Sequence, residues 1–146
     1  MNCFAATDGA SRGNPGASGV GVIVRNEQGE RILSLSGYIG ETTNNVAEYS
    51  ALLLLLRSMR SIACTRLVVH SDSELMVRQV NGRYKVKDPK LKKLFLEVQR
   101  LKEDAPYTFE LHYVPREQNA ETDRLANEGI DAKTPIASDL IGVSAH

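Results

Sequence analysis

The stretch Leu67-Val68-Val69-His70-Ser71-Asp72-Ser73-Glu74-Leu75 decides the fold of this chain. Its apolar, β-branched run predicts a buried strand, and Ser73 then marks the start of a helix. In an open α/β sheet, ligands bind outside the carboxyl ends of the strands, which is where Asp72 lies. Asp72 therefore has two candidate roles, a cap for the next helix or a functional carboxylate in a crevice. Taken alone the stretch favours the cap, because Asp and Ser are common helix caps.

Before this stretch the sequence has the pattern of an antiparallel meander. A short strand over residues 2–7 ends at a second strand-terminal carboxylate, Asp8. Residues 9–16 are rich in turn formers but lack Gly-Lys-Ser/Thr, so they are not a phosphate-binding P-loop. Two more strands are predicted over residues 19–25 and 31–38, and the polar turn between them indicates a hairpin.

The segment between the meander and the central stretch predicts a long helix over residues 46–60. Thr43 or Asn44 is placed to cap it, and its apolar residues surround it almost completely, so it is expected to pack against a sheet. Glu48 lies near its start. An acidic residue there is commonly explained by the positive end of the helix dipole, and from this segment alone that explanation is favoured.

After the central stretch the sequence predicts three more helices and one strand. A short helix over residues 73–81 has Leu75, Met76, Val77 and Val80 as its buried side, and a second helix begins at Asp88-Pro89. A strand follows over residues 108–114, and a last helix over residues 119–132 carries Asp123 near its start. Residues 133–146 resemble a loosely held tail.

These elements predict one α/β domain over residues 1–132, followed by the tail. We expect a mixed five-stranded sheet, with three antiparallel strands plus two parallel ones and helices on both faces. A right-handed crossover would place Asp8 and Asp72 on adjacent strands. Glu48 and Asp123 would reach toward them from helix starts.

Composition limits the class of protein. The chain has 146 residues with 42% hydrophobic content, and 18 basic residues balance 18 acidic ones, so no overall positive field indicates a nucleic-acid binder. The basic residues are locally concentrated, because eight of them fall between Arg83 and Lys102 against two acids. A solvated helix face and a phosphate-tracking patch explain that segment equally well.

Neither a secreted protein nor a membrane protein is expected. Cys3 and Cys64 lack the spacing of a zinc site and fit buried thiols of a reducing compartment. The N-terminus lacks the layout of a signal peptide, and the longest apolar run, residues 51–56, is far too short to span a bilayer. The cytoplasm is the expected compartment.

Four converging carboxylates require a cation, because clustered acids otherwise repel one another. A set of oxygen ligands without His or Cys suits hard ions such as Mg²⁺ or Mn²⁺. Two such ions hold the attacking and the leaving oxygen of a phosphodiester displacement, a chemistry that needs several Asp or Glu and no side-chain nucleophile.

The sequence resembles ribonuclease H type 1 over residues 1 to about 132. Four motifs carry the resemblance, in family order and spacing: Thr7-Asp8-Gly9-Ala10, Thr42-Thr43-Asn44-Asn45-Val46-Ala47-Glu48-Tyr49, Ser71-Asp72-Ser73, and the run from Pro115-Arg116-Glu117-Gln118-Asn119 through Asp123 to Asn127. Each motif alone is weak, but together and on the predicted elements they favour Asp72 as a ligand over Asp72 as a cap.

The resemblance implies that Asp8, Glu48, Asp72 and Asp123 are the catalytic residues and hold two Mg²⁺ ions, for which Mn²⁺ substitutes. The implied reaction is hydrolysis of the RNA strand of an RNA/DNA hybrid by in-line attack of water, leaving 5′-phosphate and 3′-hydroxyl ends. In the family, residues matching Asn14, Thr43, Asn44 and Asn45 line the hybrid groove. Amides and hydroxyls suit the shallow minor groove of such a duplex and its 2′-hydroxyls, although helix capping is the alternative role for Asn44 and Asn45.

The chain departs from some members of the family at three places. A mobile His before the last Asp is missing; archaeal-type and some bacterial relatives have Pro-Arg-Glu-x-Asn instead, as here, which suggests Arg116 as a further catalytic residue. A basic, Trp-rich protrusion is also missing, so hybrid affinity is either lower or dependent on the Lys-rich segment from Arg83. Finally, Glu74 stands where several relatives have a hybrid-contacting Gln, and we exclude it from the site.

Other functions remain open at this point. The alternative is a non-catalytic or weakly active module on the same fold that binds hybrids or double-stranded RNA, because a fold does not fix a function, although such a module would usually have lost one of the four acids. A metal-dependent exonuclease or phosphatase would leave residues 42–45 unexplained. A purely structural protein would bear the repulsion of four uncompensated acids. A monomeric hybrid endonuclease is therefore the preferred interpretation, with double-stranded RNA as an additional candidate substrate.

Overall fold

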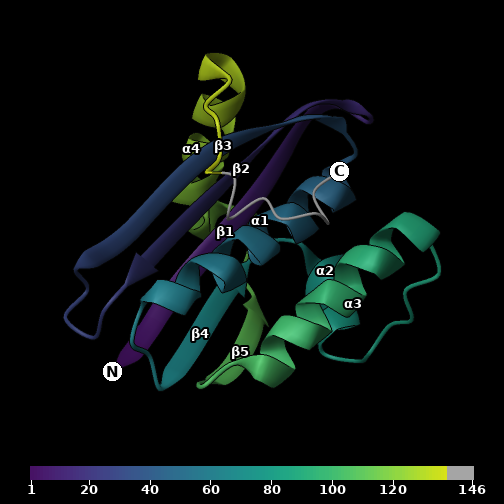
Figure 1. The fold of residues 1–146 in the computed structure, drawn as a ribbon. Coiled ribbons are helices and arrows are strands. Elements are labelled where there is room, and N and C mark those ends of the chain that lie inside the picture. The colour runs from purple at the N-terminus through teal and green to yellow at the C-terminus, as the bar shows by residue number, and fades with distance from the viewer. Residues whose placement is uncertain (138–146) are drawn as a thin grey trace.

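The protein forms one mixed sheet covered by helices on both faces, as predicted (Figure 1). The computed structural model describes residues 1–137. Its strands are β1 (Asn2–Gly13), β2 (Gly16–Arg25), β3 (Arg31–Thr42), β4 (Arg66–Ser71) and β5 (Thr108–Tyr113). Its α-helices are α1 (Asn44–Ser58), α2 (Glu74–Val80), α3 (Pro89–Asp104) and α4 (Ala120–Ala132), with short 3₁₀ turns at Met59–Ser61 and Arg116–Gln118.

The sheet has the strand order β3-β2-β1-β4-β5. Strands β1, β2 and β3 are antiparallel neighbours, whereas β4 and β5 run parallel to β1. The predicted division into three antiparallel and two parallel strands is therefore confirmed. Because β1 and β4 are adjacent and their last paired residues are Thr7 and Ser71, the next residues, Asp8 within β1 and Asp72 directly after β4, lie side by side.

The main core lies between the sheet and α1, with α3 packed over α1 (Figure 1). Residues along α1 are buried almost without interruption, which explains its lack of a polar face. The α3 stripe Leu91, Leu94, Val98 and Leu101 is buried as predicted, and Phe95 is half-buried. On the opposite face of the sheet, α4 packs against β1, β2 and β3.

The sequence prediction was wrong about the segment after Asp8. Residues 9–16 were expected to be a turn-rich connection, but β1 continues through Gly13 and pairs with β2 as far as Gly13 and Gly16. Strands β2 and β3 likewise extend beyond their predicted limits. Ladder pairing along the whole hairpin outweighs the turn preferences of the individual residues.

Two further details differ from the prediction. Leu75 is 37% exposed, so the buried side of α2 consists of Met76, Val77 and Val80 without it. In the predicted tail, the carbonyl of Thr134 accepts a hydrogen bond from the Tyr38 amide at 2.8 Å, and Ile136 packs against the core. The contacts of the domain thus extend past Ala132, while residues 138–146 lie outside the described part of the chain.

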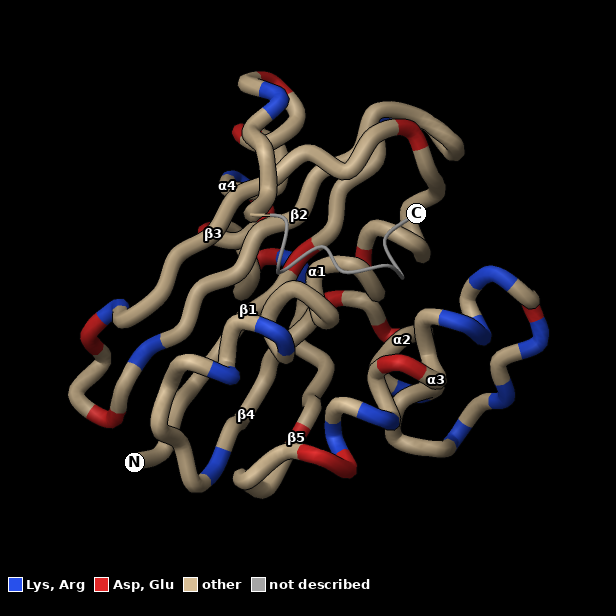
Figure 2. Tube along the Cα trace, in the orientation of Figure 1, with Lys and Arg blue, Asp and Glu red and all other residues tan. Residues whose placement is uncertain are grey.

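None of the helices within residues 1–137 has the length and apolar character needed to cross a membrane. Cys3 and Cys64 are both buried and unpaired. Figure 2 shows Lys and Arg gathered on α3 and on the loop before it, away from the sheet.

Candidate active site

A groove of about 550 Å³ opens where β1 and the end of β4 meet the N-terminal ends of α1 and α4. Seven of the nine predicted site residues line it, and they are Asp8, Asn14, Asn44, Glu48, Asp72, Arg116 and Asp123. Thr43 and Asn45 do not belong to its lining. The groove therefore collects side chains from segments far apart in the sequence, as the motif pattern predicted.

Three of the carboxylates form a tight cluster. One oxygen each of Asp8, Glu48 and Asp72 lies within 4.8 Å of the others. Asp8 and Glu48 are buried, whereas Asp72 is half-buried. The predicted convergence of β1, α1 and β4 on one point is thus present in the structure.

Burial and mutual repulsion make these carboxyl groups hold their protons. Burial and then the charges of Glu48 and Asp72 raise the pKa of Asp8 from 3.8 to about 10. Burial and the charge of Asp72 also raise the pKa of Glu48, although the Gly9 amide opposes this shift by favouring the charged form. Without a cation, the cluster is therefore largely protonated at its buried end.

Gly9 sets the distance between β1 and α1. Its amide donates a hydrogen bond of 2.9 Å to Oε1 of Glu48. A Cβ at this position would lie 2.2 Å from the Ala47 carbonyl carbon, so only glycine lets the helix backbone approach so closely. Glu48 lies in the second turn of α1 and is 6% exposed, which favours a functional role over a solvated acid at the helix dipole.

Asp72 is not the cap of α2. The hydroxyl of Ser73 accepts a hydrogen bond from the Met76 amide and occupies the N-cap position. The alternative role of Asp72 is thereby taken by its neighbour, and the Asp72 carboxylate faces the groove. Glu74 lies outside the groove lining and forms an ion pair of 2.7 Å with Arg78, consistent with its exclusion from the site.

Asp123 reaches the groove because Asn119 fixes the start of α4 on β1. The Asn119 side chain is 3% exposed and donates a hydrogen bond of 2.9 Å to the carbonyl of Thr7, the residue before Asp8. Its carbonyl and side-chain oxygens both accept from the Thr122 hydroxyl. The backbone amide of Asp123 donates to the same Asn119 carbonyl at 3.1 Å. Asn119 thus fixes Asp123 relative to Thr7, the residue before Asp8. The contact between Asp8 and Asp123 adds to the rise in the pKa of Asp8.

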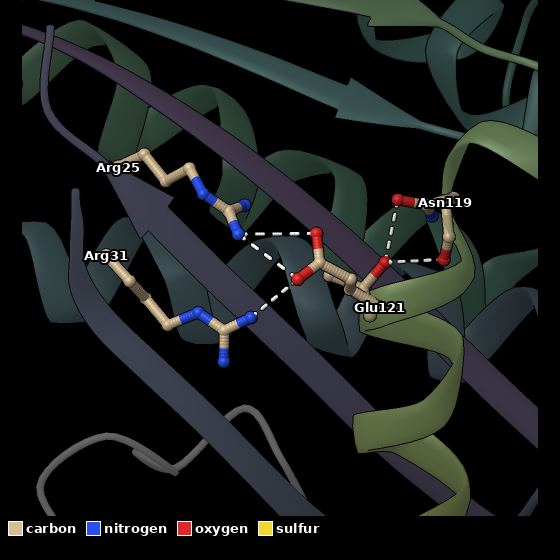
Figure 3. Close-up of polar contacts among 5 residues, drawn as sticks. Arg25, Arg31, Asn119 and Glu121 are labelled. Carbon is tan, nitrogen blue, oxygen red and sulfur yellow. Dashed lines mark hydrogen bonds and ion pairs between the residues drawn. The ribbon is translucent and has the colours of Figure 1, made fainter. Parts of the chain in front are cut away.

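Two arginines hold the same end of α4 from the sheet. Figure 3 shows Arg25 and Arg31 pointing at the carboxylate of Glu121, beside the Asn119 contacts. The shorter ion pair, from Arg31, measures 2.7 Å. Each such half-exposed ion pair contributes little stability by itself. Because the two arginines come from two strands and share one carboxylate, together they fix the position of α4 on the sheet.

Two glycines allow α4 to approach the sheet closely. A Cβ on Gly21 of β2 would lie 2.3 Å from the Thr122 carbonyl oxygen, and a Cβ on Gly129 of α4 would lie 2.5 Å from the Gly37 carbonyl oxygen. Side chains at these positions would push α4 away from the sheet and Asp123 away from Asp8.

Arg12 and Asn127 form a second contact set around Asp123. The Asn127 side-chain amide donates to the Asp123 carbonyl at 3.0 Å and to its Oδ1 at 3.4 Å. The Arg12 guanidinium in turn donates to Oδ1 of Asn127 at 3.2 Å and pairs with Asp131. Arg12 thereby orients the Asn127 amide with its nitrogen toward the carboxylate.

Arg116 lines the groove from the 3₁₀ turn before α4. Its side chain forms no ion pair with any residue within 1–137, so its charge is available at the groove surface. His112 lies on β5, outside the groove lining, with Nε2 3.1 Å from Oε1 of Glu110. Its place on a strand is as predicted.

The polar residues at the start of α1 divide into two groups. Thr43 is the N-cap, since its hydroxyl accepts a hydrogen bond from the Val46 amide. Oδ1 of Asn14 accepts from the Asn44 amide at 3.1 Å, which ties β1 to the helix start. Asn45 is exposed beside them. The helix cap is therefore Thr43 and neither Asn44 nor Asn45.

Sequence reasoning missed Gly9, Arg12, Asn119 and Asn127 as supports of the site. Asn127 follows Asp123 by four residues, which places both on one helix face, so spacing could have identified it. The contacts of Asn119 with Thr7 and of Arg12 with Asp131 join residues more than a hundred positions apart, and no local pattern signals them.

The donor set fits a hard divalent cation. It consists of carboxylate oxygens, with no His or Cys in the cluster, and oxygen ligands of this kind suit Mg²⁺ or Mn²⁺. The raised pKa values show that the buried acids lack a compensating positive charge among the described residues. A bound cation would supply that charge and displace the protons.

Comparisons with known proteins agree with this geometry. A family model described as reverse transcriptase-like matches residues 6–129. Ribonuclease HI of Halobacterium salinarum is 34% identical over 124 residues, which make up 85% of this chain and 62% of that protein. The bifunctional protein Rv2228c of Mycobacterium tuberculosis is 40% identical over 139 residues, which make up 94% of this chain and 38% of that protein. The chain therefore spans less than two thirds of the length of these curated relatives.

Some solved structures match this chain over nearly their whole length. LC11-RNase H1, isolated from compost by a metagenomic approach, has been crystallised in complex with an RNA/DNA hybrid. It matches with a TM-score of 0.86 at 42% identity, covering 90% of this chain and 98% of that chain. RNase H1 of Halobacterium salinarum matches with the same TM-score at 32% identity, covering 90% and 99%. With its four acids gathered at one groove, this chain belongs to the type 1 ribonuclease H family.

Proposed function

We propose that this protein is an endonuclease that hydrolyses the RNA strand of RNA/DNA hybrids and leaves 5′-phosphate and 3′-hydroxyl ends. The observation that carries the proposal is the cluster of Asp8, Glu48 and Asp72 within 4.8 Å, with Asp123 beside Asp8, in an open groove on a type 1 ribonuclease H fold. The hybrid held by LC11-RNase H1, a protein 42% identical to this chain, supports the choice of substrate.

The four carboxylates are proposed to hold two Mg²⁺ ions, with Mn²⁺ as a substitute. When bound, such a pair supplies a nucleophilic water and neutralises charge on the attacking and leaving oxygens. The work of the chain is to fix the four ligands before the cations arrive: Gly9 positions Glu48, and Asn119 positions Asp123. No side-chain nucleophile is needed, and none lies in the cluster.

Substrate recognition is proposed for the polar rim of the groove. Asn14 and Asn44 line it, and amide groups suit the shallow minor groove of a hybrid and its 2′-hydroxyls. Thr43 and Asn45 flank that rim at the start of α1, where Thr43 also keeps the helix end in place. These contacts would distinguish the RNA strand from the DNA strand.

Arg116 is proposed to stabilise negative charge near the scissile phosphate. Its guanidinium is exposed at the groove and lacks an ion-pair partner within residues 1–137, so it is free to approach an anionic group. A preorganised positive charge in this position acts where charge develops in the transition state. The monomeric state and the cytoplasmic location stay predictions from the sequence.

A panel of labelled substrates tests the proposal. With Mg²⁺ or Mn²⁺, the protein should cut the RNA strand of a hybrid and spare single-stranded RNA, and the products should carry 5′-phosphate ends. Cleavage of double-stranded RNA in the same panel would add a second substrate without removing the first. Tight binding of hybrid with no cleavage under either metal would contradict the proposal and favour a non-catalytic binding module.

A further inference from the structure

A second cluster of titratable side chains lies on the sheet, outside the acidic groove. His70 of β4 and His112 of β5 are register partners on adjacent parallel strands, so their side chains leave the sheet on the same face. Their ring centroids are 6.0 Å apart, and the ring planes are tilted by 36°. Neither histidine lines the groove of the four acids.

This separation suits two imidazoles on one ion. With metal–nitrogen bonds of about 2.0–2.1 Å, two histidines on a single ion place their ring centres between roughly 4.5 Å, for ligands at right angles, and roughly 6.4 Å, for ligands on opposite sides. The observed 6.0 Å falls within that range. Because both residues sit on hydrogen-bonded strands rather than on loops, the spacing is held by the sheet itself.

Glu110 orients one of the two rings. Its Oε1 lies 3.1 Å from Nε2 of His112, and its Oε2 accepts a hydrogen bond of 2.7 Å from Nε of Arg66. The Glu110 carboxylate thus contacts both Arg66 and His112. A carboxylate only accepts hydrogen bonds, so it accepts from Nε2 of His112, and Nδ1 is the ring nitrogen left to bind a metal. Histidine ligands of metals commonly donate their second N–H to a carboxylate in this way.

His70 is suited to be the second ligand. Its ring is half-buried beside His112 on the neighbouring strand. Neither of its ring nitrogens has a hydrogen-bond partner within residues 1–137. His112 is the outer member of the pair, with 53% of its side chain exposed, so an ion has access from solvent.

We propose that His70 and His112 bind one borderline transition-metal ion, of the class of Ni²⁺, Cu²⁺ or Zn²⁺, with Glu110 as the orienting group and water completing the coordination. Imidazole nitrogen suits these ions, whereas Mg²⁺ prefers oxygen, so the two sites select different metals. An ion here joins β4 to the edge strand β5 and stabilises the folded protein by mass action.

Calorimetric titration with Ni²⁺ tests the site, with excess Mg²⁺ present to compete for the carboxylates of the groove. The wild type should bind one Ni²⁺ per chain, and both His70→Gln and His112→Gln should lose this binding. Glu110→Gln should weaken it by about tenfold or more, as expected for a group that orients a ligand. His146→Gln, which changes the remaining histidine of the chain, is the matched control and should bind like the wild type.

Two further measurements keep the test independent of folding and of nuclease activity. Bound Cu²⁺ should show nitrogen hyperfine coupling from two imidazoles in its electron paramagnetic resonance spectrum. His112→Gln, an exposed position, should keep the thermal midpoint of the metal-free protein and its hybrid cleavage. Absence of Ni²⁺ binding in the wild type, or unchanged binding in both histidine variants, would overturn the proposal whatever the fate of the nuclease assignment.

Discussion

The acidic cluster should destabilise the protein when no cation is present, and Asp8→Asn should relieve this. In the folded protein the pKa of Asp8 is raised from 3.8 to about 10, so the folded state keeps a proton that the unfolded chain releases. Between these two pKa values the unfolded state binds fewer protons, and the free energy of unfolding falls as pH rises. Stability from this group is fully present below about pH 4 and is lost progressively toward pH 10.

The size of the effect follows from the same values. In the unfolded chain the carboxyl has a pKa of 3.8, so at pH 7 its ionised form outnumbers its protonated form by about 10³. This ratio corresponds to about 4 kcal/mol. The neighbouring carboxylates share the charge of the cluster, so this figure is an upper bound. Because Asn resembles the protonated acid, Asp8→Asn should gain about 2–4 kcal/mol at pH 7, or roughly 6–15 °C in thermal midpoint.

Thermal and urea unfolding in EDTA, from pH 4 to pH 9, measures this difference. The wild type and Asp8→Asn should be similar at pH 4 and diverge as pH rises. Saturating Mg²⁺ should then stabilise the wild type more than the variant. Glu103→Gln, an exposed acid on α3, is the control and should show no such divergence. A variant that is equally stable or less stable than the wild type at pH 8 would refute the account of the cluster.

The remaining predictions concern the supports of the site. Gly9→Ala should cost about 2 kcal/mol or more, measured by urea unfolding, because its methyl group would lie 2.2 Å from the Ala47 backbone; wild-type stability would show that the close approach is not needed. Asn127→Ala should weaken Mg²⁺ binding about tenfold in calorimetry, because Asp123 loses an orienting donor, and unchanged affinity would remove Asn127 from the site. Arg116→Ala should lower kcat on hybrid by more than about twofold while leaving stability unchanged, and Arg116→Lys should recover part of the loss; a smaller effect would argue against charge stabilisation.

Local patterns in the sequence predicted the sheet and placed the four acids at strand and helix ends, whereas their role as metal ligands was implied by the resemblance to ribonuclease H type 1. The apolar run before Asp72 and the meander before Glu48 have clear periodicity, and strand ends place Asp8 and Asp72 together once the crossover is drawn. The length of β1 was not predictable in the same way. Its second half consists of turn-forming residues, and only pairing with β2 holds them extended.

The residues that support the site could not be predicted from local patterns, for a different reason. The sequence marks Asn119 only as the start of a helix, yet its side chain donates to the Thr7 carbonyl on β1. The value of Gly9 likewise depends on the approach of α1 from outside its own segment. Such contacts follow from the packing of complete elements, so they emerge only once the fold is known.

We expect the four carboxylates to make this protein a metal-dependent ribonuclease H. The most direct measurement compares wild type and Asp72→Asn on one end-labelled RNA/DNA hybrid, with Mg²⁺ and with EDTA. The wild type should cleave the RNA strand in Mg²⁺ but not in EDTA, and the variant should not cleave it, while both proteins unfold cooperatively. Cleavage by Asp72→Asn at the wild-type rate, or cleavage by the wild type in EDTA, would contradict this expectation.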